Sequence, residues 1–318
     1  MEMRGIFAAE LDRMMEQDER IVVIDADLAK ANGTLLLREK YPDRAFDVGV
    51  AEQNMASIAA GLASYGFIPF ITSFCPFATR RICDQIAVSI AYASQNVKIV
   101  GSDPGISAEL NGGTHMSVED LGIMRAIPSM TVFEPVDGIQ LKKAMPQIIE
   151  HNGPVYLRLF RKKRPRILAE DYEFNLSRAD ILQAGSDVTI AASGIMVEEA
   201  LKARAVLKGQ GIEAEVINVH TLKPLDSETI LKSVVKTGCI VTAENHNIIG
   251  GLRSAVAEAV AENFPVPLRS VGIQDVFGEV GRLGELKEIF GLTAENIAAK
   301  AQEAIAAKNS QRTGGKQK

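Results

Sequence analysis

The sequence lacks the cysteine patterns of disulfide-rich and zinc-binding proteins. Its 318 residues include three cysteines, Cys75, Cys83 and Cys239, and no two of them form a CxxC pair. An odd count without paired spacing indicates neither a disulfide framework nor a structural zinc site. We therefore expect all three cysteines to pack as small hydrophobic side chains.

Long apolar runs and a strong charge of either sign are also missing. No apolar stretch approaches the length of a membrane span, and the formal net charge is -5 with a pI of about 5.6. An acidic balance gives no attraction to nucleic-acid phosphates or to an anionic membrane surface. The sequence therefore predicts a soluble, cytoplasmic protein that binds neither nucleic acid nor a membrane.

Several common catalytic motifs are absent as well. The chain has no GxSxG nucleophile elbow, P-loop, HExxH helix or EF-hand loop. The glycine-rich run at 278–284 lacks the preceding strand that a dinucleotide site requires.

What the sequence does contain is an alternation of short apolar runs with longer segments of helical period. Apolar runs at 21–24, 68–72 and 97–100 are separated by helical stretches such as 52–64 and 77–93. This alternation is typical of parallel strands linked by crossover helices. The second half repeats it on a smaller scale. We therefore predict an α/β fold of two open, mostly parallel sheets with helices on both faces.

A charged segment without clean periodicity separates the two halves, and we interpret it as a solvated linker. The final residues contain no apolar anchor and are predicted to be disordered. The predicted organisation is a first domain over 1–165, a linker over 166–182, a second domain over 183–308 and a disordered tail over 309–318.

The most informative segment is Gly-Val-Ala-Glu-Gln-Asn-Met at 49–55, at a predicted junction of strand and helix. Ligands of open parallel sheets bind at such an edge. Glu52 alone has a simple explanation, a favourable interaction with the helix dipole. One helix and one strand later, however, Phe74, Phe77 and Arg80 come to the same edge. The edge therefore collects a carboxylate, two aromatic rings and a base.

This pattern, Ala-Glu-Gln-Asn-Met and then Phe-x-x-Phe-x-x-Arg-x-x-x-Asp-Gln, resembles the pyrimidine-binding domain of transketolases and of the related deoxyxylulose phosphate synthases. The resemblance covers nearly the whole chain, continuing through the segments 101–105, 112–115, 117–120, 222–226, 243–246 and 250–251. It implies a thiamine diphosphate pyrimidine-binding domain followed by a transketolase C-terminal domain.

The resemblance implies transfer of a two-carbon ketol unit from a ketose to an aldose by thiamine diphosphate. In this family a carboxyl group bonds the cofactor's aminopyrimidine and so activates it, and Glu52 matches that carboxyl group. Phe74 and Phe77 match an apolar wall for the ring, and His115 matches a His or Gln that reaches cofactor and substrate. The predicted cofactor-binding residues are Asp27, Glu52, Phe74, Phe77, Arg80 and His115, with Glu52 and His115 predicted to be catalytic.

The residues predicted to contact the substrate are Asn32, Asp103, Asn111 and Arg161. Arg161 matches an arginine that binds the distal anion of a sugar phosphate. The other positions depart from the family, which places Ser where this chain has Ala31 followed by Asn32, a substrate His at Asp103 and an Asp at Asn111. Because an acidic Asp103 would repel a phosphate, either the sugar terminus is held elsewhere or the substrate differs from ordinary sugar phosphates. We expect a phosphorylated or sulfonated ketose.

The Gly-Asp-Gly motif with a following Asn, which holds magnesium and the diphosphate in thiamine enzymes, is absent from the chain. Mg²⁺ requires hard oxygen ligands, so no metal-ligating residues are predicted here. We expect a separate N-terminal transketolase subunit to hold most of the thiamine diphosphate and the Mg²⁺. The active site then lies between the two chains, in an α2β2 heterotetramer.

Three alternatives remain at this stage. The beta subunit of a 2-oxoacid dehydrogenase has a similar length and plan, although the runs at 51–55 and 222–226 favour transketolase. A deoxyxylulose phosphate synthase would be a single longer chain. A catalytically silent relative is the third alternative, suggested by Ala31, Asp103 and Asn111, but retention of Glu52 argues against it.

Overall fold

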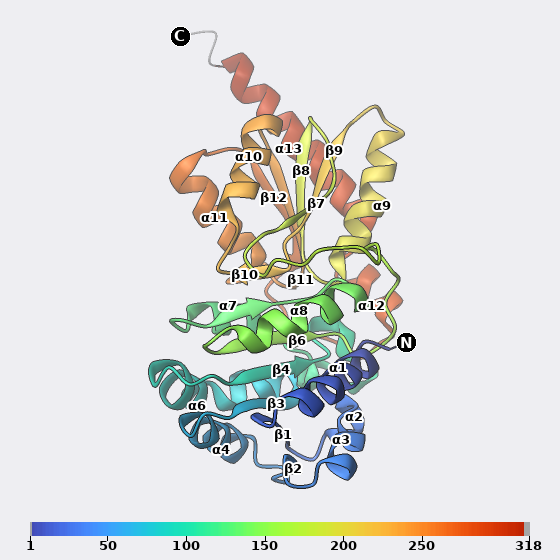
Figure 1. Cartoon of the computed structure of the whole chain (residues 1–318). Helices are drawn as coiled ribbons and strands as arrows, with labels where there is room; N and C mark the ends of the chain where they lie inside the picture. The colour runs from blue at the N-terminus through green and yellow to red at the C-terminus, as the bar shows by residue number, and fades with distance from the viewer. Residues whose placement is uncertain (1, 315–318) are drawn as a thin grey trace.

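Two sheets, one for each half of the chain, form the framework of the protein (Figure 1). The computed structural model describes residues 2–314. None of the helices within these residues has the length and apolar character needed to cross a membrane. The elements are α1 (Met3–Gln17), β1 (Ile21–Asp25), α2 (Ala29–Asn32), α3 (Leu35–Lys40), β2 (Ala45–Asp47), α4 (Glu52–Ser64), β3 (Ile68–Phe74), α5 (Cys75–Ala78), η1 (Arg80–Ile82), α6 (Cys83–Gln85), η2 (Ile86–Tyr92), β4 (Lys98–Ser102), η3 (Gly105–Asn111), η4 (Gly113–His115), α7 (Asp120–Ala126), β5 (Thr131–Phe133), α8 (Gly138–Glu150), β6 (Val155–Leu159), β7 (Asp180–Gln183), β8 (Val188–Ala192), α9 (Met196–Lys208), β9 (Ala214–Asn218), β10 (Thr221–Lys223), α10 (Ser227–Thr237), β11 (Ile240–Asn247), α11 (Leu252–Asn263), β12 (Leu268–Ile273), α12 (Leu283–Ile289) and α13 (Ala294–Gly314).

The first sheet has seven strands in the order β10-β5-β6-β4-β3-β1-β2, and all six strands from the first half of the chain are parallel. Successive side chains of a strand point to opposite faces of the sheet. In β3, Phe70 therefore packs beneath α1, where its ring lies 6.3 Å from that of Phe7, whereas Ile71 belongs to the core beneath α4 that includes Met55. Burial on both faces explains why these strands are continuously apolar.

The second sheet has five strands in the order β12-β11-β8-β9-β7, with β7 antiparallel to its neighbour. Helices α9 and α13 pack on one face, and α10 and α11 on the other. Strand β10 leaves this half of the chain and pairs antiparallel with β5 of the first sheet. The prediction of an α/β fold with two open, mostly parallel sheets is confirmed.

The predicted single helix over 77–93 is wrong. The segment consists of α5, η1, α6 and the π-helix η2. Thr79 has φ −128° and ψ −84°, outside the helical region, and its Oγ1 donates to the carbonyl oxygen of Cys75 at 2.7 Å. A Thr side chain that bonds the backbone in this way competes with helix propagation, so the helix breaks here.

Two predicted boundaries also differ. β7 begins at Asp180, so the second sheet starts inside the segment predicted as a linker. α13 continues to Gly314, so the predicted disordered tail is wrong for residues 309–314, and residues 315–318 lie outside the described residues. The helix is anchored at Lys308, whose Nζ donates to the carbonyl oxygens of Asp187 at 2.6 Å and Thr237 at 3.0 Å.

The carboxyl ends of four parallel strands meet at one edge of the first sheet. Asp27 follows β1, Phe74 ends β3, Asp103 follows β4 and Arg161 follows β6. The strand order therefore brings residues from across the first domain to one edge, where ligands of open α/β sheets bind.

Asp25, at the end of β1, generates a prediction about stability. Its carboxylate is fully buried and accepts hydrogen bonds from Thr34 Oγ1, at 2.7 Å, and from Thr72 Oγ1. Burial raises its pKa from 3.8 to about 6. The folded protein therefore binds this proton more tightly than the unfolded chain, so the free energy of unfolding falls as pH rises from about 4 to 6. A rise of about two pKa units corresponds to about 3 kcal/mol.

We expect Asp25→Asn to remove this pH dependence, because the amide does not titrate. Relative to the unmodified protein, the variant should gain up to about 3 kcal/mol between pH 4 and pH 7, measured by urea unfolding at each pH. Asp171→Asn, the same change at an exposed position, is the control. Equal pH dependence in the Asp25 variant and the unmodified protein would contradict the assignment.

Candidate functional site

Three rings form an aromatic wall at the carboxyl edge of the first sheet. Phe74 ends β3, Phe77 lies in α5 and His115 ends η4. Their centroids are 6.2 Å apart for the two phenylalanines, and His115 lies 5.9 Å from Phe74 and 5.3 Å from Phe77. Pro76 favours the start of α5, because its fixed φ suits the first helical turn. All three rings are half-buried, so the wall is open to a ligand on one side.

Arg81 connects the carboxylate of Glu52 to this wall by a hydrogen bond and a ring contact. Glu52 opens α4 and its side chain is 5% exposed. Arg81 Nη1 donates to Glu52 Oε1 at 2.6 Å, and the Arg81 guanidinium lies 3.9 Å from the centroid of Phe77. The structure therefore brings together an acid, a base and an aromatic face.

Arg81 was missed by the sequence analysis, which selected its neighbour. Arg80 instead pairs with Glu119 at 2.8 Å, in a largely exposed contact. The position of Arg81 four residues after Phe77 was the available signal, because residues at that spacing share a helix face. The break at Thr79 makes that signal weak.

Arg161 lies on the other side of the wall, where its guanidinium is 4.8 Å from the centroid of Phe74. Asp103, 2% exposed, accepts from Arg161 Nε at 2.5 Å and from the Arg161 backbone N–H at 3.2 Å. The carboxylate therefore offsets the charge of Arg161 and fixes its orientation.

A second arginine, Arg4, lies beside Arg161, although the sequence did not predict it as a site residue. Arg4 Nη1 and Arg161 Nη1 both donate to the carbonyl oxygen of Ala31, at 3.0 and 3.3 Å. Helix α1 holds Arg4 there, because the Arg4 backbone N–H donates to the carbonyl oxygen of Arg161 at 3.1 Å. Arg4 also pairs with Glu2 at 2.7 Å in a partly exposed contact. The two guanidinium groups favour an anion beside this oxygen. No local pattern joins residues 4 and 161.

The remaining predicted residues do not join this group. Asn32 is 2% exposed; its amide donates to Thr72 Oγ1 at 3.2 Å and accepts from Ser102 Oγ at 2.8 Å. The Asn32 amide therefore stabilises the sheet interior, and its substrate contact stays a prediction. Asp27 and Asn111 are exposed at the ends of β1 and η3, and no contact joins them to the aromatic wall among the described residues.

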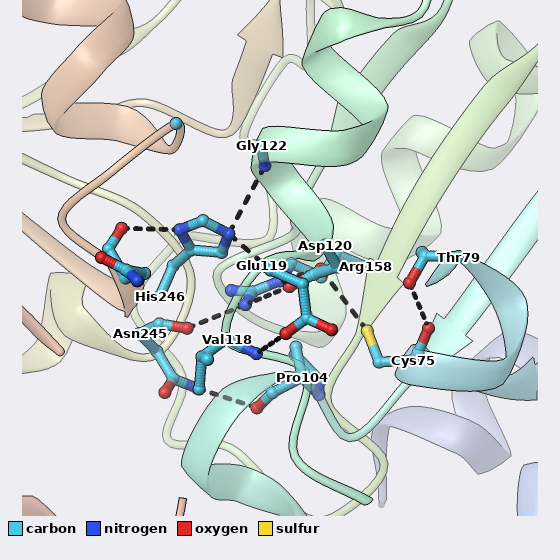
Figure 2. Close-up of polar contacts among 12 residues, drawn as sticks. Cys75, Thr79, Pro104, Val118, Glu119, Asp120, Gly122, Arg158, Asn245 and His246 are labelled. Atoms are coloured by element: carbon cyan, nitrogen blue, oxygen red, sulfur yellow. Dashed lines mark hydrogen bonds and ion pairs between the residues drawn. The ribbon is translucent and has the colours of Figure 1, made fainter. Parts of the chain in front are cut away.

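A buried charge network connects Arg158 and Asp120 to Cys75, the residue before Pro76 in α5 (Figure 2). Arg158 of β6 donates from Nε and Nη2 to Asp120, at 2.7 and 3.0 Å, and from Nη1 to Glu134 at 3.0 Å. Tyr156 and Cys75, the residue that begins α5, also contact Asp120. Burial pushes the pKa of Asp120 upward, but Arg158 outweighs burial and holds that pKa below its usual value.

Within residues 2–314, no three His, Cys, Asp or Glu side chains converge as a metal site would require. The aromatic wall and the neighbouring Glu52 carboxylate can hold a flat ring. Arg4 and Arg161 can hold an anion.

Comparisons with known proteins agree with the resemblance read from the sequence. The family profile "Transketolase, pyrimidine binding domain" matches residues 1–166, and "Transketolase, C-terminal domain" matches residues 177–297. The 6-deoxy-6-sulfo-D-fructose transketolase subunit SqwH of Clostridium sp. (strain MSTE9) is 59% identical over 294 residues, covering 92% of this chain and 91% of the relative.

Two further proteins match this chain over nearly the full length of both sequences. The putative transketolase C-terminal section of Methanocaldococcus jannaschii is 42% identical over 304 residues, covering 95% of each protein. A solved structure described as a split gene transketolase, inactive beta4 tetramer, has a TM-score of 0.89 at 40% identity and covers 97% of this chain and 99% of its own.

The buried pair of Asp120 and Arg158 generates a second stability prediction. Asp120→Asn removes one charge and leaves the buried guanidinium with only part of its compensation. We expect a loss of about 3 to 5 kcal/mol in the free energy of unfolding, measured by urea denaturation. Glu228→Gln, which breaks an exposed pair with Lys232, should cost less than about 1 kcal/mol. Similar costs for the two variants would refute this role for Asp120.

Proposed function

This chain belongs to the transketolase family, and on that premise we propose that it is the carboxyl-terminal subunit of a cytoplasmic two-chain transketolase. The enzyme moves a two-carbon ketol unit from a ketose to an aldose and needs a partner subunit to bind thiamine diphosphate. The observation that carries the proposal is the buried carboxylate of Glu52 beside the half-buried rings of Phe74, Phe77 and His115.

The residues of this chain fit the aminopyrimidine end of thiamine diphosphate. A flat ring suits the faces of Phe74 and Phe77, and a buried carboxyl group suits a ring nitrogen. Arg81 bonds Oε1 of Glu52, so we assign Oε2 to the ring nitrogen. When bound, thiamine diphosphate supplies the nucleophilic carbon that takes up the two-carbon unit. The Glu52 carboxyl group exchanges a proton with the ring.

The diphosphate and Mg²⁺ are assigned to a partner subunit. Mg²⁺ needs hard oxygen ligands, and residues 2–314 contain no group of three or more His, Cys, Asp or Glu side chains that could hold a metal. Large apolar side chains are exposed between β2 and α4, in η3 and between β12 and α12: Val50 at 74%, Leu110 at 68% and Phe277 at 80%. Exposed apolar surface of this kind marks an interface. It supports a partner that closes the site, in an α2β2 assembly.

We assign the anion site of Arg4 and Arg161 to the far end of the ketose. A sulfonate carries one negative charge, whereas a phosphate monoester carries about 1.5 to 2 at pH 7. Asp103 already offsets the charge of Arg161, so the site suits the weaker anion. The relative at 59% identity, named for 6-deoxy-6-sulfo-D-fructose, supports the same substrate class. We therefore propose a ketose with a terminal sulfonate as the donor.

Reconstitution tests the proposed reaction. This chain, purified with its amino-terminal partner, thiamine diphosphate and Mg²⁺, should transfer a two-carbon unit from a ketose to an aldose, whereas the chain alone should not. Glu52→Gln should lower kcat by about 10² to 10⁴, because the amide cannot exchange the proton. Size-exclusion chromatography should show unchanged assembly.

Glu228→Gln, the same substitution at an exposed position in α10, is the matched control for turnover. Turnover of pyruvate with an artificial electron acceptor instead of ketol transfer would favour a 2-oxoacid dehydrogenase. Full activity of the Glu52 variant would leave the catalytic assignment without support.

The charge of Asp103 generates a prediction about substrate choice. Asp103→Asn removes a negative charge from the anion site while the amide oxygen can still accept from Arg161. The ratio of kcat/KM for a phosphorylated ketose to that for its sulfonated analogue should rise roughly tenfold, since the second charge of the phosphate is no longer repelled. Asp43→Asn, at an exposed position, should leave the ratio unchanged. An unaltered ratio in the Asp103 variant would argue against the sulfonate assignment.

A further inference from the structure

His115 lies in an irregular segment, residues 104–119, that belongs to the first domain but is bonded to the second. Asn245, fully buried at the end of β11, makes the main connection. Its Oδ1 accepts from the backbone N–H of Ile106 at 3.0 Å. Its Nδ2 donates to the carbonyl oxygen of Pro104 at 2.9 Å, as Figure 2 shows. The side chain thereby satisfies two backbone groups of the segment, as a neighbouring strand would.

Asn245 is itself held in one position. Its backbone carbonyl oxygen accepts from Arg158 Nη2 at 2.8 Å. Gly105, at φ +54°, lies so close that a Cβ atom there would clash with the Asn245 amide. Asn245, which the buried charge network holds in place, therefore fixes the position of the first residues of the 104–119 segment.

The rest of the segment also lies against the second domain. The backbone N–H of Asn247 donates to the carbonyl oxygen of Val118 at 2.8 Å. A Cβ atom on Gly113 would clash with the carbonyl oxygen of Gly278, so the turn that carries His115 packs directly on the loop between β12 and α12, residues 274–282. Both ends and the turn of the segment are thus held by the second domain.

The neighbouring His246 extends this connection. Its Nδ1 bonds the carbonyl oxygen of Asn247 at 2.7 Å, and its Nε2 accepts from the backbone N–H of Gly122 at 3.4 Å. This pattern requires the neutral ring. Burial lowers the pKa of His246 to about 4, which agrees with that form.

We propose that Asn245 is a positioning residue that acts through His115. The second domain then contributes to catalysis by fixing the 104–119 segment, so that the His115 ring stays against Phe74 and Phe77 and faces the reacting groups. The inference rests on the proposed function, because His115, through which Asn245 acts, is a residue of the proposed transketolase site. Among the described residues, the rings and the carboxylate of the aromatic wall all come from the first domain. The inference therefore gives the second domain a role in the site.

A double-mutant cycle in the two-chain complex tests the inference. Asn245→Ala should lower kcat/KM roughly ten- to a hundredfold, because a catalytic group displaced by about 1 Å loses that much. In a His115→Ala background the same change should cost less than about threefold, since there is no longer a ring to position. Equal losses in the two backgrounds would overturn the inference, as would no loss in the unmodified background.

Asn218→Ala is the matched control. Asn218 has the same side chain, is also fully buried in the second sheet, and bonds Asp180 and Gln140 instead of the 104–119 segment. Its variant should lose stability to a similar degree while kcat/KM stays within about twofold. A comparable activity loss in this control would mean that destabilisation alone explains the effect.

A second measurement separates the inference from the proposed function. Amide hydrogen exchange on this chain requires no turnover, and Asn245→Ala should raise exchange at least tenfold for the amides of Ile106 and of residues 112–116. Asn218→Ala should leave those amides unchanged. Unchanged exchange in the Asn245 variant would overturn the inference even if the complex is a transketolase. Raised exchange in a complex without ketol transfer would uphold the positioning of the segment and reject the proposed function.

Discussion

The buried guanidinium of Arg158 is the group on which the arrangement of both domains depends. It lies in β6, an interior strand of the first sheet, with no exposed surface. A buried charge without compensation is strongly destabilising, so its partners have to be in place. Asp120 and Glu134 supply opposite charge, and Asn245 supplies a carbonyl oxygen. Because these partners come from α7, the end of β5 and β11, one cation fixes three elements from two domains.

The aromatic wall depends on the Arg158 guanidinium indirectly, through Asp120 and Asn245. Asp120 contacts Cys75, the first residue of α5, and α5 carries Phe77. On the other side, Asn245 bonds the segment that carries His115. The two edges of the wall are thus connected to a single buried network. Such preorganisation spares the site the cost of ordering its rings when a ligand binds.

Charge is distributed differently at the two ends of the site. At the Glu52 end, one carboxylate faces one guanidinium, that of Arg81, and the neighbouring face is apolar. At the other end, Arg4 and Arg161 converge, but Asp103 offsets part of their charge. The first arrangement suits a weakly basic ring that exchanges a proton. The second suits a modest anion, because a fully dianionic group would meet the carboxylate as well as the arginines.

The sequence by itself determined the two sheets and the edge that carries Glu52, Phe74 and Phe77. Apolar period and strand ends are local features, and residues at the carboxyl ends of parallel strands must share an edge. Only the tertiary structure decided that Arg4 meets Arg161 and that Asn245 holds the 104–119 segment. Those contacts join residues more than a hundred positions apart, and their geometry follows from how helices and sheets pack rather than from any local periodicity.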